Sequence, residues 1–241
     1  MLKKSLLASA LILSSTAALA DWYVQPKVGY ESRNYELNVS DISATATIPG
    51  VIAGLSLINS TGWYLDFEAS VGDNDVEGFF AEEDYIERYD ITFSGGKSLG
   101  SGYTIFGGYN IVETKMENQK QQIGEADEVL FSTEGAFGGL SKSFSITKTQ
   151  TLSLSGAIGL MTGYYRITEF NVGEDEAEGS AIGYSANLAY SYRPSTSLAL
   201  TMGFKTQAYN YTDMKDETDG SSWADTDETL SNVFAKASLT F

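Results

Sequence analysis

The sequence has no cysteine, no histidine and only three prolines in 241 residues. Without cysteine there can be no disulfide, so the stability of the fold has to come from packing or from closure of a sheet. Without histidine there can be no Ser–His or Asp–His pair and no imidazole ligand to a metal. These absences remove the commonest forms of acid–base and nucleophilic catalysis, and they predict that the protein is not an enzyme.

Long apolar runs are also missing, except at the beginning of the chain. Residues 1–20 have the features of a cleaved signal peptide: Lys3 and Lys4, an apolar middle over residues 6–13, and Ala18-Leu19-Ala20 as a cleavage site. The alternative is a membrane anchor helix, but the apolar run is much shorter than the ~20 residues that a span requires. We therefore expect a single domain over residues 21–241.

Basic residues are few compared with acidic ones. The formal net charge is −17, and loss of Lys3 and Lys4 with the signal peptide makes it −19. Such a charge argues against nucleic acid as a partner, because binding to phosphate backbones needs a basic surface. The 24 glycines and 15 tyrosines, with little proline, are typical of many strands joined by tight turns and flanked by aromatic bands.

The last ten residues show the clearest strand pattern. Leu239, Ala237, Ala235 and Val233 alternate with polar residues, and the chain stops at Phe241. This pattern resembles the assembly signal of bacterial outer-membrane β-barrels, with Phe241 and Leu239 as its residues. An ordinary edge strand is the alternative.

Ten segments in all have a two-residue period. Short Ser-, Thr-, Gly- or Pro-containing connections follow the even-numbered segments, whereas longer and mostly acidic connections are expected after the odd-numbered ones. In the sixth segment, Gly138-Gly139 is a candidate β-bulge. The segments comprise residues 22–34, 48–59, 63–71, 85–97, 103–114, 129–143, 151–167, 181–193, 198–211 and 232–241.

The mature chain as a whole resembles the small, porin-like outer-membrane β-barrels of Gram-negative bacteria. The resemblance implies an all-β, up-and-down antiparallel transmembrane barrel of ten strands, or of eight if one hairpin lies outside. It further implies export by the signal peptide, location in the outer membrane, and contact with lipid, lipopolysaccharide and the barrel assembly machinery. The oligomeric state stays open. The barrel enzymes of this membrane resemble one another in using a histidine, which this chain lacks.

The polar face of the predicted strands carries charges of both signs. In a narrow barrel these side chains would point inward and would have to pair, which predicts a salt-bridge plug. The alternative is a path for small solutes or ions. Paired carboxylates such as Asp66 with Glu68 or Asp73 with Asp75 are more simply explained by such pairing or by solvation than by catalysis. The predicted interior charges are Lys27, Glu31, Arg33, Asp66, Glu68, Arg88, Asp90, Glu134, Lys142, Lys205 and Lys236.

Most acids are expected in three outer loops, over residues 73–84, 169–178 and 213–228. In the first, Asp73, Asp75, Glu77 and Asp84 resemble the opening and the twelfth position of a calcium loop, although the flanking helices are missing. Calcium is therefore a candidate loop-bound ion. The simpler alternative is a set of hydrated loops above an anionic lipopolysaccharide surface.

These observations predict a structural or surface-interaction role for the barrel, without enzymatic activity and without a cofactor. A narrow channel for small solutes is the alternative function. A soluble periplasmic lipid-binding barrel is a third possibility, and it agrees poorly with Phe241 at the end of a strand.

Overall fold

The computed structural model describes residues 22–39, 42–76, 84–118, 126–169, 173–216, 220–222 and 226–241. The predicted signal peptide lies outside these residues. Among the described residues, no helix is long and apolar enough to cross a membrane.

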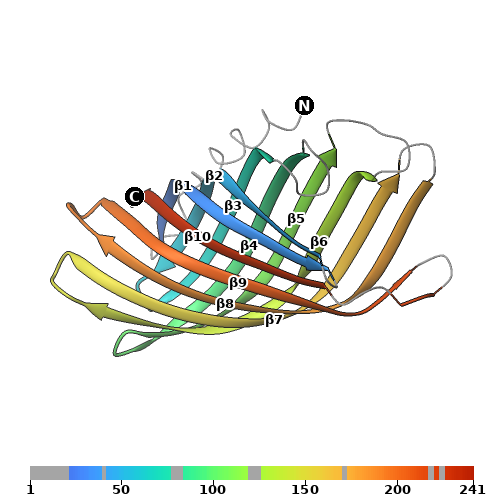
Figure 1. The fold of residues 1–241 in the computed structure, drawn as a ribbon. Coiled ribbons are helices and arrows are strands. Elements are labelled where there is room, and N and C mark those ends of the chain that lie inside the picture. Colours follow the sequence, from blue (N-terminus) through green and yellow to red (C-terminus); the bar gives the residue numbers. More distant parts are fainter. Residues whose placement is uncertain are drawn as a thin grey trace.

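The fold is a single closed barrel of ten antiparallel strands, as predicted (Figure 1). Each strand pairs with its neighbours in sequence, and β1 pairs with β10 to close the sheet. Eight strands with an outlying hairpin is thereby excluded. The strands are β1 (Trp22–Val39), β2 (Ile42–Asn59), β3 (Trp63–Val76), β4 (Asp84–Gly100), β5 (Tyr103–Asn118), β6 (Ala126–Ser145), β7 (Gln150–Glu169), β8 (Gly173–Tyr192), β9 (Leu198–Asp216) and β10 (Thr226–Leu239).

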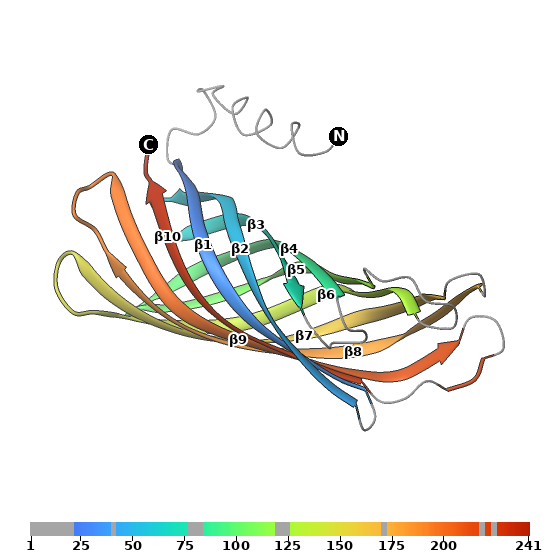
Figure 2. The same cartoon turned by 45° about the horizontal axis from the view of Figure 1, so that its top comes forward.

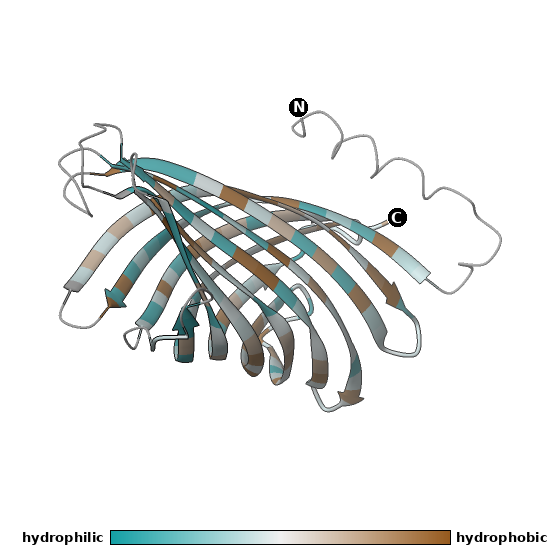
Figure 3. Cartoon of the chain, turned by 90° about the vertical axis from the view of Figure 1, so that its right-hand side faces the viewer, coloured by the Kyte–Doolittle hydropathy of each residue, from teal (hydrophilic) through white to brown (hydrophobic). Residues whose placement is uncertain are grey.

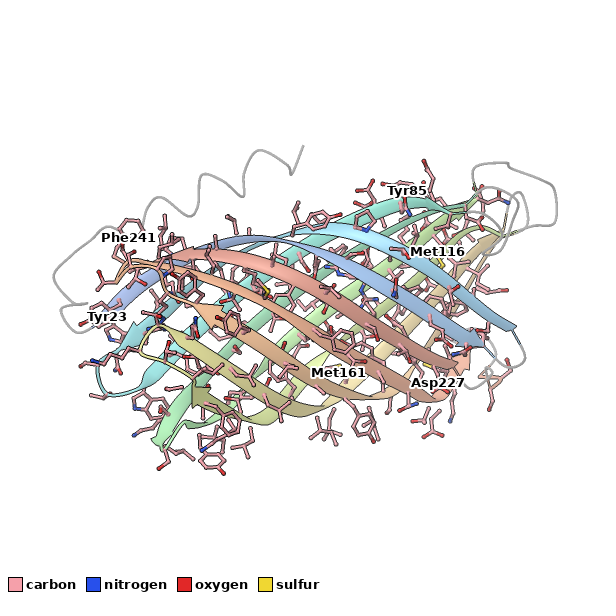
Figure 4. All side chains as sticks on the ribbon, turned by 60° about the vertical axis from the view of Figure 1, so that its left-hand side comes forward. Tyr23, Tyr85, Met116, Met161, Asp227 and Phe241 are labelled. Atoms are coloured by element: carbon pink, nitrogen blue, oxygen red, sulfur yellow. The ribbon has the colours of Figure 1, made fainter. Side chains whose placement is uncertain are left out.

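One end of the barrel, here called the turn end, carries the short connections that the sequence predicts. Phe241 lies at this end, as does Tyr23, whereas Met116 and Asp227 lie at the opposite, loop end (Figure 4). Between β4 and β5, Ser101 and Gly102 both have positive φ, of 51° and 79°. This is the conformation of a two-residue hairpin turn whose twist matches that of its strands.

The strands are longer than predicted. Parts of the acidic segments that were predicted as loops are strand: β3 continues to Val76, β8 begins at Gly173, and β9 continues to Asp216. In the predicted 169–178 loop, residue 169 and residues 173–178 are strand. The predicted bulge at Gly138-Gly139 is wrong, since the register of β6 runs unbroken through both glycines.

The polarity of the two faces of the wall inverts along the strands. In the turn-end half the outward residues are apolar; Val28, Leu65 and Leu160 are 64%, 42% and 74% exposed. We call this outward apolar surface the belt. In the loop-end half the outward residues are polar and the inward ones apolar; Leu37 and Ile86 are 2% and 0% exposed. In Figure 3, hydrophobic and hydrophilic bands alternate along the tilted strands. Figure 2 shows the tilt of the strands around the barrel from a second direction.

Candidate functional site in the barrel interior

Arg88 is the central cation of the interior. Its guanidinium is fully buried and contacts Asp90 at 3.3 Å, Glu228, and the hydroxyl of Thr114 at 2.6 Å. Glu228 in turn accepts a hydrogen bond of 2.8 Å from Tyr211. Three strands separate β4 from β10 in the barrel order, so the Arg88–Glu228 pair crosses the lumen.

Arg33 forms a second group next to the first. It pairs with Glu31, which precedes it by two residues on β1, and its Nη2 lies 3.3 Å from Asp90 on β4. Asp90 therefore joins the two arginines. Asn232 of β10 donates a hydrogen bond of 2.7 Å to Glu31. Buried ion pairs need such extra hydrogen bonds to offset the loss of hydration.

Two lysines form a third group toward the turn end. Lys27 Nζ lies 2.9 Å from Asp66 and 2.8 Å from Glu68, and Lys236 Nζ lies 2.7 Å from Glu68. The predicted carboxylate pair Asp66 and Glu68 is thus occupied by two ammonium groups, which leaves neither free to act as a base. Nine residues of the interior prediction lie in these charged groups or line the lumen beside them: Lys27, Glu31, Arg33, Asp66, Glu68, Arg88, Asp90, Lys205 and Lys236.

An apolar cluster surrounds the Arg88–Glu228 pair and fills the loop-end part of the lumen. Ile48, Ile86 and Val112 in this cluster are at most 1% exposed, and the rings of Phe131 and Tyr165 lie 4.3 Å apart. We call this cluster the apolar seal. Its buried members are Tyr35, Leu37, Ala44, Ala46, Ile48, Ile86, Val112, Met116, Val129, Phe131, Tyr165, Ala177, Ala181, Tyr209, Tyr211, Met214 and Leu230.

Toward the turn end the interior contains a polar cavity of about 400 Å³. Its lining includes the charges of the second group, Asp66, Glu68 and Lys236 of the third group, a row of serines on β6 and β7, and the rings of Phe106 and Phe137. The inward side chains nearest the turn end, such as Ser143, Ser153 and Thr201, are partly exposed. The cavity is therefore accessible from the turn end, while the apolar seal closes the other side.

Two predicted interior residues lie elsewhere. Glu134 is exposed and hydrogen-bonds Tyr109 on the outer face, and Lys142 covers the outward ring of Tyr103 at 3.8 Å. Both occupy even-numbered positions of β6, and those positions face outward along the whole strand. The prediction was wrong because the glycines of β6 interrupt the apolar pattern that would reveal which face points inward.

The residues proposed to bind calcium do not converge. Asp73 and Asp75 have outward positions on β3, where Tyr85 donates a hydrogen bond of 3.1 Å to Asp73. Asp84, at the start of β4, is 2% exposed and faces inward. Glu77 lies outside the described residues. Within the part of the chain that the structure describes, no group of three or more acidic residues could hold a metal ion.

The outer face changes from apolar to acidic at a level where tyrosines such as Tyr89 and Tyr164 bond acidic side chains. Tyr89 donates a hydrogen bond of 2.7 Å to Glu113, and Tyr164 donates one to Glu176. In the loop-end half, burial opposes ionisation of Glu128, but hydrogen bonds from Lys115 and Arg166 outweigh it and lower its pKa. Phe241 and Leu239 are 75% and 46% exposed at the turn-end edge of the belt, and their role in assembly stays a prediction.

Several interior residues were not predicted. Glu228 was assigned to an acidic loop, although it is 1% exposed and completes the Arg88 pair. Glu228 is an even number of residues from Asn232 and Lys236, so the three share one face of a strand. Extending the predicted last strand back to residue 228 would have placed Glu228 in the interior. Asn110 and Tyr209 form a second link across the lumen, at 3.3 Å.

Solved structures with the same architecture identify the fold. The outer-membrane protease OmpT of Escherichia coli superimposes with a TM-score of 0.54 at 11% identity, over 93% of this chain and 98% of that one. The fold is that of the outer-membrane β-barrels. The β domain of the Bordetella autotransporter BrkA gives a TM-score of 0.55 at 10% identity, over 90% and 99% of the two chains.

The translocator domain of the autotransporter NalP of Neisseria meningitidis is a third similar structure, with a TM-score of 0.52 at 9% identity over 97% and 92% of the chains. No protein-family model and no curated protein matches the sequence. At identities this low the similarity establishes the fold alone, because function depends on sites that differ among proteins of one fold.

Proposed function

We propose that the protein is a closed, non-enzymatic barrel of the Gram-negative outer membrane, whose wall projects from the lipid and presents an acidic surface. The belt supports the membrane location: outward apolar residues on all ten strands are what lipid requires. The short connections and Phe241 at the turn end correspond to the periplasmic end of such barrels. Cleavage after Ala20 belongs to this proposal.

The lengths of the strands support the projecting wall. A tilted strand needs about 9–11 residues to cross the membrane, whereas β6, β7 and β8 have 20 residues each. The loop-end half would therefore stand in the external medium. Its outward residues are acidic, among them Glu36, Glu87, Glu117, Glu174 and Asp227. Such a wall would lie beside anionic lipopolysaccharide, with free divalent cations between the two.

The observation that carries the proposal is the closure of the interior. The Arg88–Glu228 and Asn110–Tyr209 links cross the lumen, and the apolar seal, which includes Tyr209, packs around them. Ions would have to break buried salt bridges and enter an apolar core, both of which are costly. A structural or surface-interaction role follows, with a narrow channel as the alternative that experiment has to exclude.

Single-channel recording in planar bilayers tests the proposal. The refolded protein, shown to be folded by its heat-dependent migration on a gel, is expected to give no conductance steps. A general porin reconstituted in the same bilayers controls for insertion. Discrete and reproducible openings of the folded protein would contradict the closed barrel and establish the channel.

A further inference from the structure

Four polar side chains lie at one level of the interior on four successive strands. Lys205 of β9 is in register with Asn187 of β8 on one side and with Asn232 of β10 on the other. Asn232 is in register with Arg33 of β1. All four side chains line the polar cavity. We call them the polar row.

Each member of the polar row has a polar group without a partner. Asn187 Oδ1, Asn232 Oδ1 and Arg33 Nη1 are buried and accept or donate no hydrogen bond. Asn232 and Arg33 are 8% and 2% exposed. Within the described residues, no carboxylate lies at salt-bridge distance from Lys205 Nζ. Buried polar groups normally have partners, so three unmet buried groups beside the Lys205 ammonium on one cavity wall require an explanation.

The charges of the interior indicate what kind of ligand would supply those partners. Apart from Asp84, which faces inward at the loop end of β4, the charged groups and the polar row contain five cations and five carboxylates: Lys27, Arg33, Arg88, Lys205 and Lys236 with Glu31, Asp66, Glu68, Asp90 and Glu228. Lys205 contributes to this balance by electrostatic attraction without a salt bridge, chiefly to Asp90 and Glu68. A bound ion would disturb the balance, whereas a neutral ligand would not.

The donors and acceptors of the polar row match hydroxyl groups. A hydroxyl can accept a hydrogen bond from Lys205 or Arg33 and donate one to an asparagine oxygen. The neighbouring strands β5 and β6 offer the rings of Phe106 and Phe137, 6.3 Å apart, and β6 and β7 offer the hydroxyls of Ser141 and Ser155, the latter in register with Asn187. An apolar ring face and hydroxyl partners suit a molecule with C–H and O–H surfaces.

We propose that the cavity binds a small, neutral, polyhydroxylated solute of monosaccharide size, which enters from the turn end and makes its hydrogen bonds to the polar row. The cavity volume of about 400 Å³ lies in the range of ligand pockets, about 300–1,000 Å³. Only the assignment of the entrance to the periplasmic side depends on the proposed function. A closed barrel can hold such a ligand, because the apolar seal lies beyond the cavity.

Ligand-detected saturation-transfer NMR of the refolded mature chain, with D-glucose and gluconate as separate probes, tests the proposal. D-glucose is expected to bind in the millimolar range or tighter and more strongly than gluconate. Lys205→Met should weaken D-glucose binding at least tenfold, and Ser155→Leu, which places a bulky side chain in the cavity beside Asn187, should weaken it as well. Lys148→Met, at an exposed turn, is the matched control and should leave binding unchanged.

Stronger binding of gluconate than of D-glucose would overturn the neutral class of ligand. No binding of either probe to protein of unchanged melting temperature would mean that the cavity holds water only, and would overturn the site. Both results are independent of the conductance recording, so failure of this proposal and failure of the closed barrel can be told apart.

Discussion

The two halves of the barrel wall use the same pleat in opposite ways. In β1, Val28 and Tyr30 point outward and are 64% and 56% exposed, whereas Tyr35 and Leu37 point inward and are 1% and 2% exposed. Lipid surrounds the first half under the proposed function, and water surrounds the second. The alternation of side chains stays fixed, so only the composition of each face can change.

The difference also determines what stabilises each half. The turn-end half has an apolar outside and must place polar groups inside, where charges have to pair. The loop-end half has a polar outside and can bury apolar side chains, as a water-soluble barrel does. The charged groups around Arg88 and Arg33 lie where the two arrangements meet.

Removing the cation at this boundary should have the largest effect. Arg88→Met leaves Glu228 and Asp90 buried with one partner fewer and is expected to destabilise the barrel by about 3–5 kcal/mol. Guanidinium-induced unfolding in lipid vesicles would measure it. The double variant Arg88→Met/Glu228→Gln should be less destabilised than the single one. A loss below about 1 kcal/mol for the single variant would show that this pair contributes little.

Creating a cavity in the apolar seal should be nearly as costly. Ile86→Ala is expected to lower the free energy of unfolding by about 2–5 kcal/mol, because rigid neighbours cannot fill the space. Ile105→Ala is the matched change in the belt, where the side chain is 53% exposed. It should cost less, since lipid chains can close over the site. Equal losses of unfolding free energy in the two variants would contradict the inference that the two halves are stabilised differently.

A charge placed on the outer face should distinguish the halves along one strand. In β8, Leu188→Arg puts a cation in the belt and is expected to cost about 2–4 kcal/mol. Ser180→Arg, eight residues away in the loop-end half, should change stability by less than about 0.5 kcal/mol. Vesicle unfolding would again provide the measurement. A large loss for Ser180→Arg would mean that lipid extends further up the wall.

The smallest effect concerns Glu128 in the loop-end half. The pKa of Glu128 is lower in the folded than in the unfolded state. Its contribution to the free energy of unfolding is therefore fully present above the unfolded pKa, and it disappears as the pH falls through the folded pKa. Glu128→Gln should cost less than about 1 kcal/mol at pH 7. The difference from the original protein should vanish in acid. A difference that persists there would indicate lost packing rather than lost charge.

Local pattern was enough to predict the strands of the belt. Each belt strand shows apolar residues at alternate positions, and the tight turns carry the expected glycines and serines, so ten strands were found. The upper strands were missed because their alternation changes phase. Residues 44–48 alternate as regularly as any belt segment, yet Ala44, Ala46 and Ile48 belong to the opposite face.

The sequence by itself determined the barrel and its strand number, because a two-residue period is a local property. The tertiary structure decided which charges meet. Arg88 and Glu228 lie 140 residues apart, and only closure of β1 on β10 brings β4 and β10 to opposite sides of one lumen. The register of β9 with its two neighbouring strands places Lys205 between Asn187 and Asn232. Periodicity gives the face of a side chain, whereas its partner depends on register and curvature.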